Sequence, residues 1–340
     1  MNNNSKILPI KHPMITVYAH HAHFLSILPY DDATLPWVYN NYINVLRFLD
    51  HKMANFHLPG HDGFAPIEMC KRLSVQKIIR DDITTYFRSF VDFVVYHIEK
   101  GNYVISMLDH YCLPPSAHYN QNHFRHDVLI YGYDLEKRVF YTSDFYKDGI
   151  YSFEPIPFDC IEKGFSSIYE DQDYLYDMVY LFKIVLDGEF VVDIDTIARS
   201  IRAYMEKTPF DYWSLYKPVP QSDKIIFGAE IYSELEKDLV FIREKANAAE
   251  IDIRPFSVLQ AHKKINKMRF EYLVKKGFLL YDVKELESLE TLTAMLINLI
   301  IKYSIKIDSN IMDKAISVLK EINERDIYLC NELLRILSRG

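Results

Sequence analysis

Residues 109–144 read DHYCLPPSAHYNQNHFRHDVLIYGYDLEKRVFYTSD, and this stretch decides the fold. The apolar run Val128–Tyr133 follows His126 and ends in a Gly-Tyr-Asp turn, and a second run, Val139–Thr142, leads to Asp144. Short apolar runs separated by a turn predict antiparallel strands. Because one strand begins with His and its partner ends with Asp, we expect imidazole and carboxylate to lie side by side, as in a base and the group that orients it.

The composition excludes several classes of function. The formal net charge is −8, from 39 Lys and Arg against 47 Asp and Glu. This charge argues against a binder of nucleic acid or of anionic membranes, because both need a basic surface. Only 10 glycines occur, with neither GxGxxG nor GxxxxGK[ST], so a nucleotide-dependent enzyme is disfavoured.

The sequence also predicts the compartment. The first residues, MNNNSKILPIKHP, show no apolar signal segment, and we find no apolar stretch long enough to span a bilayer. The four cysteines are widely separated and form no CxxC pair. We therefore expect a reduced, cytoplasmic protein without a membrane anchor.

The predicted elements divide the chain in two. Helices and then short strands in the first half indicate an α+β domain over residues 1–190, and long helical patterns indicate a mainly α-helical domain over 191–340. Loops are expected over 57–66 and 207–223. The predicted helices are His23–Leu28, Leu35–Asp50, Ile83–Ile98, Ile194–Met205, 225–247, 255–276, 284–304 and 309–337; the predicted strands are Tyr103–Leu108, Val128–Tyr133, Val139–Thr142, Ile150–Phe153 and Met178–Val185.

The opening block resembles the N-terminal domain of the butirosin biosynthesis protein H family. That family is similar to papain-like cysteine peptidases that process bacteriocin leaders. Its namesake is an acyltransferase of antibiotic biosynthesis, which moves an acyl group from a carrier-protein thioester to an amine. The residues that carry the resemblance are Val104–Leu108, Asp109, Tyr111, Leu113-Pro114, His123, His126, Gly132-Tyr133-Asp134 and Asp144.

The resemblance implies a papain-like first domain with His126 as general base and Asp144 as its orienter. It also implies a nucleophilic Cys at the start of the first core helix, where the helix N-terminus lowers the pKa of a thiol. Here residues 17–28 read VYAHHAHFLSIL, so the expected Cys falls at or next to His20, and no cysteine occurs before Cys70. The chain departs from the family at its nucleophile.

Three interpretations follow from the missing thiol. The chain can be an inactive homologue that serves as a binding or scaffold protein. It can instead form an amide directly from the activated thioester, with His20, His21 and His126 handling protons. Finally, Cys112 can replace the missing nucleophile, although it lies where the family has an ordinary loop residue.

The expected partners follow from the acyl-transfer interpretation. They are an acyl or peptidyl carrier protein, which brings its own phosphopantetheine arm, and a small-molecule amine; no cofactor of its own is expected, and a homo-oligomer is compatible with the sequence. Asp109, Tyr111 and His123 are the candidate substrate-binding residues, although Asp109 can equally cap a turn. Basic residues in 254–264 (Arg254, His262, Lys263 and Lys264) suit docking of an acidic carrier protein, or form a solvated helix face.

A metal-binding hydrolase is the competing class. Imidazole suits zinc, and six histidines would converge if the first helix packed on the strand that starts at His126. No HExxH motif occurs, so we assign no metal ligand. The six are His20, His21, His23, His118, His123 and His126.

Overall fold

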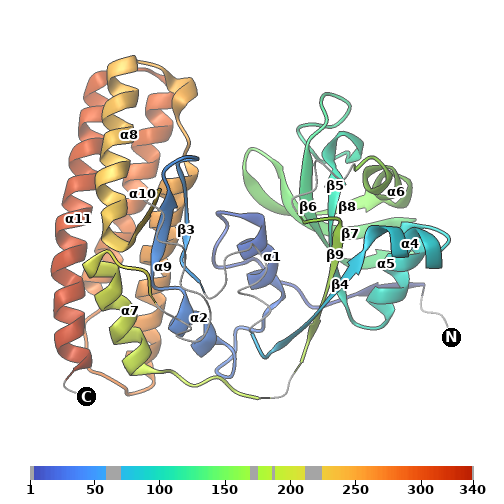
Figure 1. The fold of residues 1–340 in the computed structure, drawn as a ribbon, viewed down its shortest axis with the longest axis horizontal. Coiled ribbons are helices and arrows are strands. Elements are labelled where there is room, and N and C mark those ends of the chain that lie inside the picture. Colours follow the sequence, from blue (N-terminus) through green and yellow to red (C-terminus); the bar gives the residue numbers. More distant parts are fainter. Residues whose placement is uncertain (1–3, 59–69, 169–174, 186–187, 211–223, 339–340) are drawn as a thin grey trace. The chain divides into compact units, whose positions relative to one another are not determined.

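The computed structural model describes residues 4–58, 70–168, 175–185, 188–210 and 224–338. The protein is α+β with a helical C-terminal region, as the sequence predicts, and it forms two compact units (Figure 1). The first unit contains Met1–Tyr30 and Gly63–Gly188, and the second contains Asp31–Asp62 and Glu189–Gly340.

The first unit is built on a seven-stranded sheet in the order β4-β9-β5-β6-β7-β8, with β1 also paired to β6. Every pairing in it is antiparallel. The central strands β5 and β6 are almost entirely buried, which explains why their sequences read as continuous apolar runs. The strands are β1 (Ser5–Ile7), β4 (Leu73–Ile79), β5 (Tyr103–Asp109), β6 (Arg125–Asp134), β7 (Val139–Lys147), β8 (Ile150–Pro157) and β9 (Met178–Ile184).

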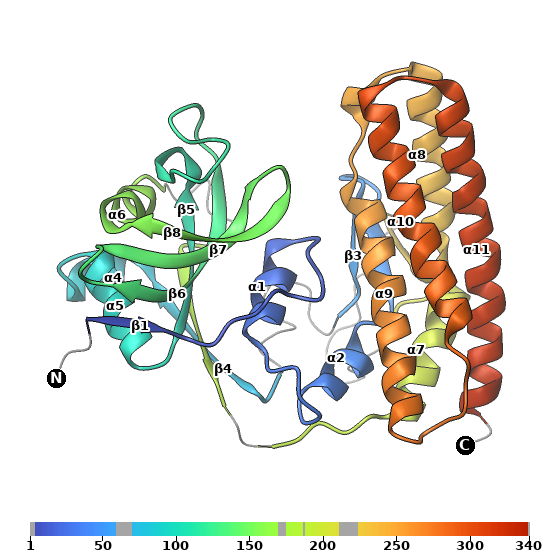
Figure 2. The same cartoon turned by 180° about the vertical axis from the view of Figure 1, so that it is seen from behind.

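Helices cover both faces of this sheet. Helix α1 (Ala19–Ile27) contacts β6 and β7 from one side, whereas α4 (Arg80–Tyr86), α5 (Phe90–Glu99) and α6 (Phe158–Ser166) lie on the other (Figures 1 and 2). The single helix predicted over Ile83–Ile98 is therefore two helices. The break has a local cause, because the side chain of Ser89 accepts a hydrogen bond from Asp92 N and caps α5.

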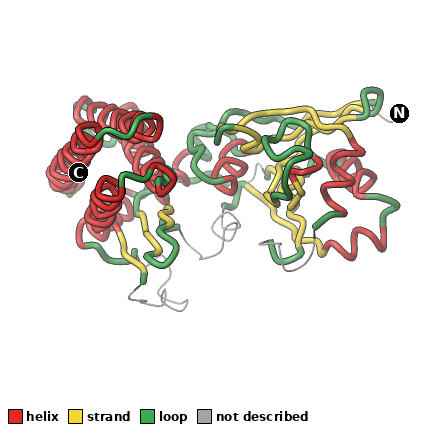
Figure 3. The backbone as a smooth tube through the Cα atoms, turned by 90° about the horizontal axis from the view of Figure 1, so that it is seen from above, coloured by secondary structure: helices red, strands yellow, loops and turns green. Residues whose placement is uncertain are grey.

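The second unit is a bundle of long helices with a small sheet beside it. Figure 3 shows the long helices nearly end-on. Its sheet has the antiparallel order β10-β2-β3. The elements are α2 (Leu35–Asn41), β2 (Val45–Phe48), β3 (Met53–Phe56), α7 (Ile194–Glu206), β10 (Ile225–Phe227), α8 (Ile231–Lys245), α9 (Arg254–Lys275), α10 (Lys284–Ile305) and α11 (Ser309–Leu337), with short 3₁₀ turns η3 (Gly228–Glu230) and η4 (Ala248–Glu250).

The structure corrects the sequence-based assignment of residues 31–62. The predicted first domain included them, but they belong to the second unit, where α2 contacts α7 and α9, and β3 contacts α9. The helix predicted over Leu35–Asp50 ends at Asn41, and residues 45–48 form β2 because they pair with β3 and β10. Likewise, the helix predicted over 225–247 begins with strand β10.

Other expectations have mixed outcomes. Residues 59–66 and 211–223 of the two predicted loops lie outside the described residues. We expected no segment long enough to span a membrane, but α10 is long and apolar enough by length and composition alone. One such helix is weak evidence by itself, and 28% of its apolar window is buried inside the protein.

Candidate acid–base site

Three neighbouring strands bring the candidate site together. In the β5–β6 register Leu108 lies opposite His126, and in the β6–β7 register Leu129 lies opposite Ser143. Side chains two residues apart share a face of a sheet. The pairing therefore places His126 and Asp144 on the same face, diagonally across the hairpin, within reach of each other.

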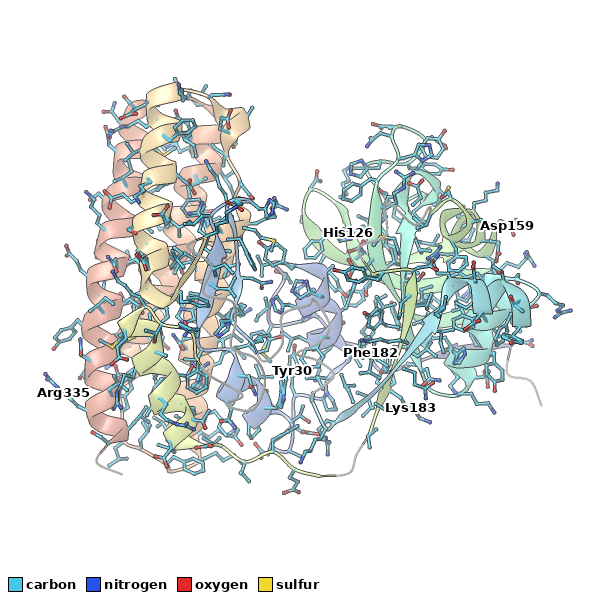
Figure 4. The ribbon with its side chains drawn as sticks, in the orientation of Figure 1. Tyr30, His126, Asp159, Phe182, Lys183 and Arg335 are labelled. Carbon is cyan, nitrogen blue, oxygen red and sulfur yellow. The ribbon has the colours of Figure 1, made fainter. Side chains whose placement is uncertain are left out.

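The predicted pair is formed. Nδ1 of His126 lies 2.7 Å from Oδ2 of Asp144 in a hydrogen bond. The Asp144 side chain is fully buried, whereas that of His126 (labelled in Figure 4) is 24% exposed. Among the residues that the structure describes, Nε2 of His126 has no hydrogen-bond partner. The imidazole is thus oriented by a buried carboxylate and keeps one nitrogen available; its catalytic role stays a prediction.

Neighbouring carboxylates favour the protonated form of His126. Burial disfavours a charge on its ring, but the carboxylates of Asp144 and Asp127 outweigh burial and raise the pKa of His126 to about 9. Burial would also raise the pKa of Asp144, yet the adjacent His126 and His110 lower it below its usual value. At neutral pH the pair is therefore an imidazolium beside a carboxylate.

His20 and His21 lie in the first turn of α1, the position where the resembled family has its thiol. Their ring centroids are 4.2 Å apart. Burial, reinforced by His21, holds the pKa of His20 well below its usual value, and the charge of His126 acts in the same direction against the opposing effect of Asp127. His20 is partly exposed and neutral, whereas His21 is buried beneath the surface.

A second buried network anchors α1 to the sheet, and sequence analysis missed it. Nδ1 of His23 lies 2.8 Å from the hydroxyl of Tyr151, and its Nε2 lies 3.0 Å from the backbone oxygen of Asp127. The hydroxyl of Tyr151 also lies 2.9 Å from Oγ of Ser143. This network fixes the helix that carries His20. No local signal marks it, because its members are spread over residues 23–151.

The structure revises the role of Asp109. Its side chain is fully buried and accepts hydrogen bonds from Tyr111 N (3.1 Å), Phe124 N (3.1 Å), His123 Nδ1 (2.5 Å) and Ser167 Oγ (3.3 Å). Four donors converge on this carboxylate, so it organises the loop between β5 and β6, and the turn-capping alternative is confirmed; its contact with substrate stays a prediction. Tyr111 stacks on the exposed ring of His123, with centroids 4.6 Å apart, and both remain candidates for substrate contact.

Neither Cys112 nor Cys70 has an activated thiol. Burial and the charge of Asp109 raise the pKa of the Cys112 thiol above its ordinary value, so it is a poor nucleophile at neutral pH. Burial raises the pKa of Cys70 to about 12. The structure therefore gives no support to Cys112 as the nucleophile.

The histidines proposed to converge on a metal do not do so. His118 pairs with Asn122, while His23 and His123 pair with the groups given above. Within the described part of the chain, the only possible metal cluster consists of His110, His126 and Asp144. In this cluster both histidines approach the same oxygen, Oδ2 of Asp144: Nδ1 of His126 lies 2.7 Å from it and Nε2 of His110 lies 3.0 Å from it. Ligands around tetrahedral zinc lie about 3.3 Å apart; the 2.7 Å contact is instead a hydrogen bond, and we assign no metal ligand.

Two of the four residues of the basic patch expected on α9 are buried, whereas Arg254 is exposed and Lys264 partly exposed. His262 and Lys263 are 1% and 2% exposed. Nε2 of His262 lies 2.7 Å from the backbone oxygen of Ile43, and Nζ of Lys263 lies 2.5 Å from Oδ2 of Asp326. Both side chains are buried and bound to internal partners, so they are not accessible to a carrier protein.

Neither a protein-family model nor a curated protein matches this sequence. The resemblance to the butirosin biosynthesis protein H family therefore rests on its motif residues alone.

Proposed function

We propose that this protein transfers an acyl group from a carrier-protein thioester to the amine of a small molecule, in the cytoplasm, as a step of nonribosomal-peptide antibiotic biosynthesis. The observation that carries the proposal is the 2.7 Å hydrogen bond between Nδ1 of His126 and the buried Asp144, which leaves the other ring nitrogen available. The resemblance of residues 104–144 to the butirosin biosynthesis protein H family supports the choice of reaction.

Each of two histidines, whose pKa values are shifted in opposite directions, carries out one of the two proton transfers. His20, held neutral, accepts the proton of the attacking amine, and the His126 imidazolium donates its Nε2 proton to the sulfur as the carbon–sulfur bond breaks. The amine nitrogen forms the new amide bond with the acyl carbon, and the phosphopantetheine thiol leaves with the carrier protein. Transfer of the proton from His20 to His126 restores the starting state. The reaction needs no thiol on the enzyme.

The function is tested with a model thioester, an acyl-N-acetylcysteamine, and a panel of small amines, with amide formation followed by mass spectrometry. We expect amide formation above the uncatalysed rate, and a loss of roughly 10²–10⁴-fold in His126→Gln, the usual contribution of a general acid or base. The matched control is His51→Gln, at an exposed histidine of the second unit, which should leave the rate unchanged. An equal rate in wild type and His126→Gln would contradict the proposal.

A binding protein without catalysis is the second candidate. The observation that favours it is His20 itself, because it stands in the first turn of α1 where the resembled family has its nucleophilic thiol. In that case an acyl-loaded carrier protein binds, and its thioester persists for as long as it does without the protein. Calorimetric binding combined with an unchanged thioester half-life would establish this alternative.

A further inference from the structure

His110 contacts Asp144 of the acid–base pair from the buried side, and sequence analysis did not single it out. It begins the 3₁₀ turn η1 (His110–Cys112), which directly follows β5. Its side chain is fully buried and stacks on the ring of Tyr146, with centroids 5.6 Å apart, while Phe124 meets it edge-on, also at 5.6 Å. The ring is therefore held in place by packing.

A chain of polar contacts sets the tautomer of His110. The backbone N–H of His118 donates to Oγ of Ser116 at 3.1 Å, and this hydroxyl lies 3.1 Å from Nδ1 of His110. The hydroxyl proton is then free to point at Nδ1, which leaves the ring proton on Nε2. Nε2 lies 3.0 Å from the ionised Asp144, which also selects an N–H there over a lone pair.

The carboxylate of Asp144 depends on two imidazoles. Oδ2 receives His126 at 2.7 Å and His110 at 3.0 Å, whereas Oδ1 is buried and has no hydrogen-bond partner in the described part of the chain. The His110 N–H is not aligned as in a regular hydrogen bond, so it acts on the carboxylate chiefly through its nearness, as a buried dipole whose nitrogen lies 3.0 Å from Oδ2. Among the described residues, His126 and His110 are the two side chains that form ion-pair contacts with this carboxylate.

We propose that His110 is a positioning residue, which fixes the Asp144 carboxylate and limits how strongly that carboxylate acts on His126. The proposal rests on the proposed function, since it gives a role to the same acid–base pair. His110 becomes the third member of the site, beside His126 and Asp144. Through the His118 N–H, the Ser116 hydroxyl and the His110 imidazole, the loop after β5 then influences the proton affinity of His126.

The direction of the effect follows from charge. An N–H dipole close to a carboxylate stabilises the negative charge of that carboxylate and weakens its interaction with another proton donor. Without the N–H, the charge of Asp144 acts on His126 alone. The other described groups that act on or face His126 are Asp127 on β6 and His20 on α1, and replacement of His110 alters neither. Loss of the His110 donor should therefore raise the pKa of His126.

The test is an NMR titration of the His126 ring in the full chain, without substrate. In His110→Phe, which keeps the bulk and removes the donor, we expect the midpoint to rise by about one pH unit. In His110→Gln, whose amide can donate from a similar place, it should return close to the wild-type value. Equal midpoints in wild type and His110→Phe, or an equal rise in both variants, would overturn the proposal.

A second variant covers the case in which His110→Phe does not fold, as judged by circular dichroism. Ser116→Ala removes the hydroxyl that sets the tautomer and leaves the ring in place, so the His126 midpoint should move up by a smaller amount; no movement counts against the proposal. Because no substrate is present, the titration does not depend on acyl transfer. A titration as expected without amide formation would reject the function alone, and amide formation with an unmoved midpoint would reject the role of His110 alone.

Discussion

At the scale of the residue, the site depends on the positive charge of His126. Burial disfavours this charge, and the neighbouring Asp144 stabilises it. The folded protein raises the pKa of His126 from 6.5 to about 9. A group whose pKa is raised by folding stabilises the protein fully below its unfolded value, and this contribution disappears as the pH rises through the folded value. The stability contributed by the pair is therefore present at pH 6 and lost between about pH 6.5 and 9.

This linkage gives a prediction for Asp144→Asn. The wild-type free energy of unfolding should fall by about 2–3 kcal/mol between pH 6.5 and 9 beyond any general trend, and most of this fall should disappear in the variant. Urea unfolding at several pH values measures it. Asp148→Asn makes the same change at an exposed position of the same hairpin and should leave the fall intact. An equal fall in Asp144→Asn would show that the pair is not charged as described.

Residue patterns predicted the pair but not its surroundings. His126 and Asp144 could be found because strand alternation and a hairpin are local properties of the sequence. His110 was missed because its approach to Asp144 depends on how η1 turns after β5. Lys263 was misread as a surface charge, because its partner Asp326 is remote in sequence and becomes a neighbour only when α9 and α11 pack.

At the scale of the element, Gly132 in the Gly-Tyr-Asp motif explains how β6 pairs with two strands, β5 and β1, along one of its edges. Residues 104–109 of β5 pair with 125–130 of β6, and β1 then takes the next place on the same edge, with Ile7 opposite Gly132. A Cβ atom at Gly132 would lie 2.8 Å from the backbone oxygen of Lys6. The glycine is needed for close approach of the two backbones.

We predict that Gly132→Ala displaces β1. The clash involves backbone atoms, so the strands must separate, at a cost of about 1–3 kcal/mol in unfolding free energy. Hydrogen exchange should show lost protection at the amides of the β1–β6 pair. In a chain that lacks residues 1–8 the same substitution should cost much less, because the clashing backbone is gone. A full loss of stability in the truncated chain would point to another cause.

Some elements escaped prediction because pairing overrides local periodicity. Residues 35–50 carry apolar side chains at helical spacing, yet 45–48 form a strand between β3 and β10, and β10 comes from far along the chain. The long helices α9, α10 and α11 were predicted almost to the residue, since over many turns one amphipathic pattern dominates.

At the scale of the whole molecule, each unit has its own buried polar centre. In the helical unit, Asp326 of α11 is 2% exposed and pairs with Nζ of Lys263 at 2.5 Å. The hydroxyls of Tyr204 and Tyr232 donate to the same carboxylate at 2.6 and 2.9 Å. This cluster connects α7, α8, α9 and α11, so its integrity decides how four helices pack together.

We predict that Asp326→Asn destabilises the helical unit by about 3–5 kcal/mol, because it leaves the ammonium of Lys263 buried without a counter-charge. Thermal unfolding followed by circular dichroism measures the loss. The double variant Lys263→Met/Asp326→Leu should recover a large part of it, since no uncompensated charge remains. Asp313→Asn breaks the exposed pair with Arg243 and should cost less than about 1 kcal/mol. Similar losses in both single variants would contradict the role of the buried centre.

The central claim is that His126, protonated beside Asp144, supplies the proton for acyl transfer. The pH dependence of amide formation tests it most directly, with an acyl-N-acetylcysteamine thioester and an amine so weakly basic that it stays neutral above pH 6. We predict that the enzymatic rate falls as the pH rises through about 9, the pKa of His126, and that in Asp144→Asn this fall moves towards 6.5, the ordinary value for histidine. A rate that is constant or rising through pH 9, or the same profile in Asp144→Asn, would contradict the account.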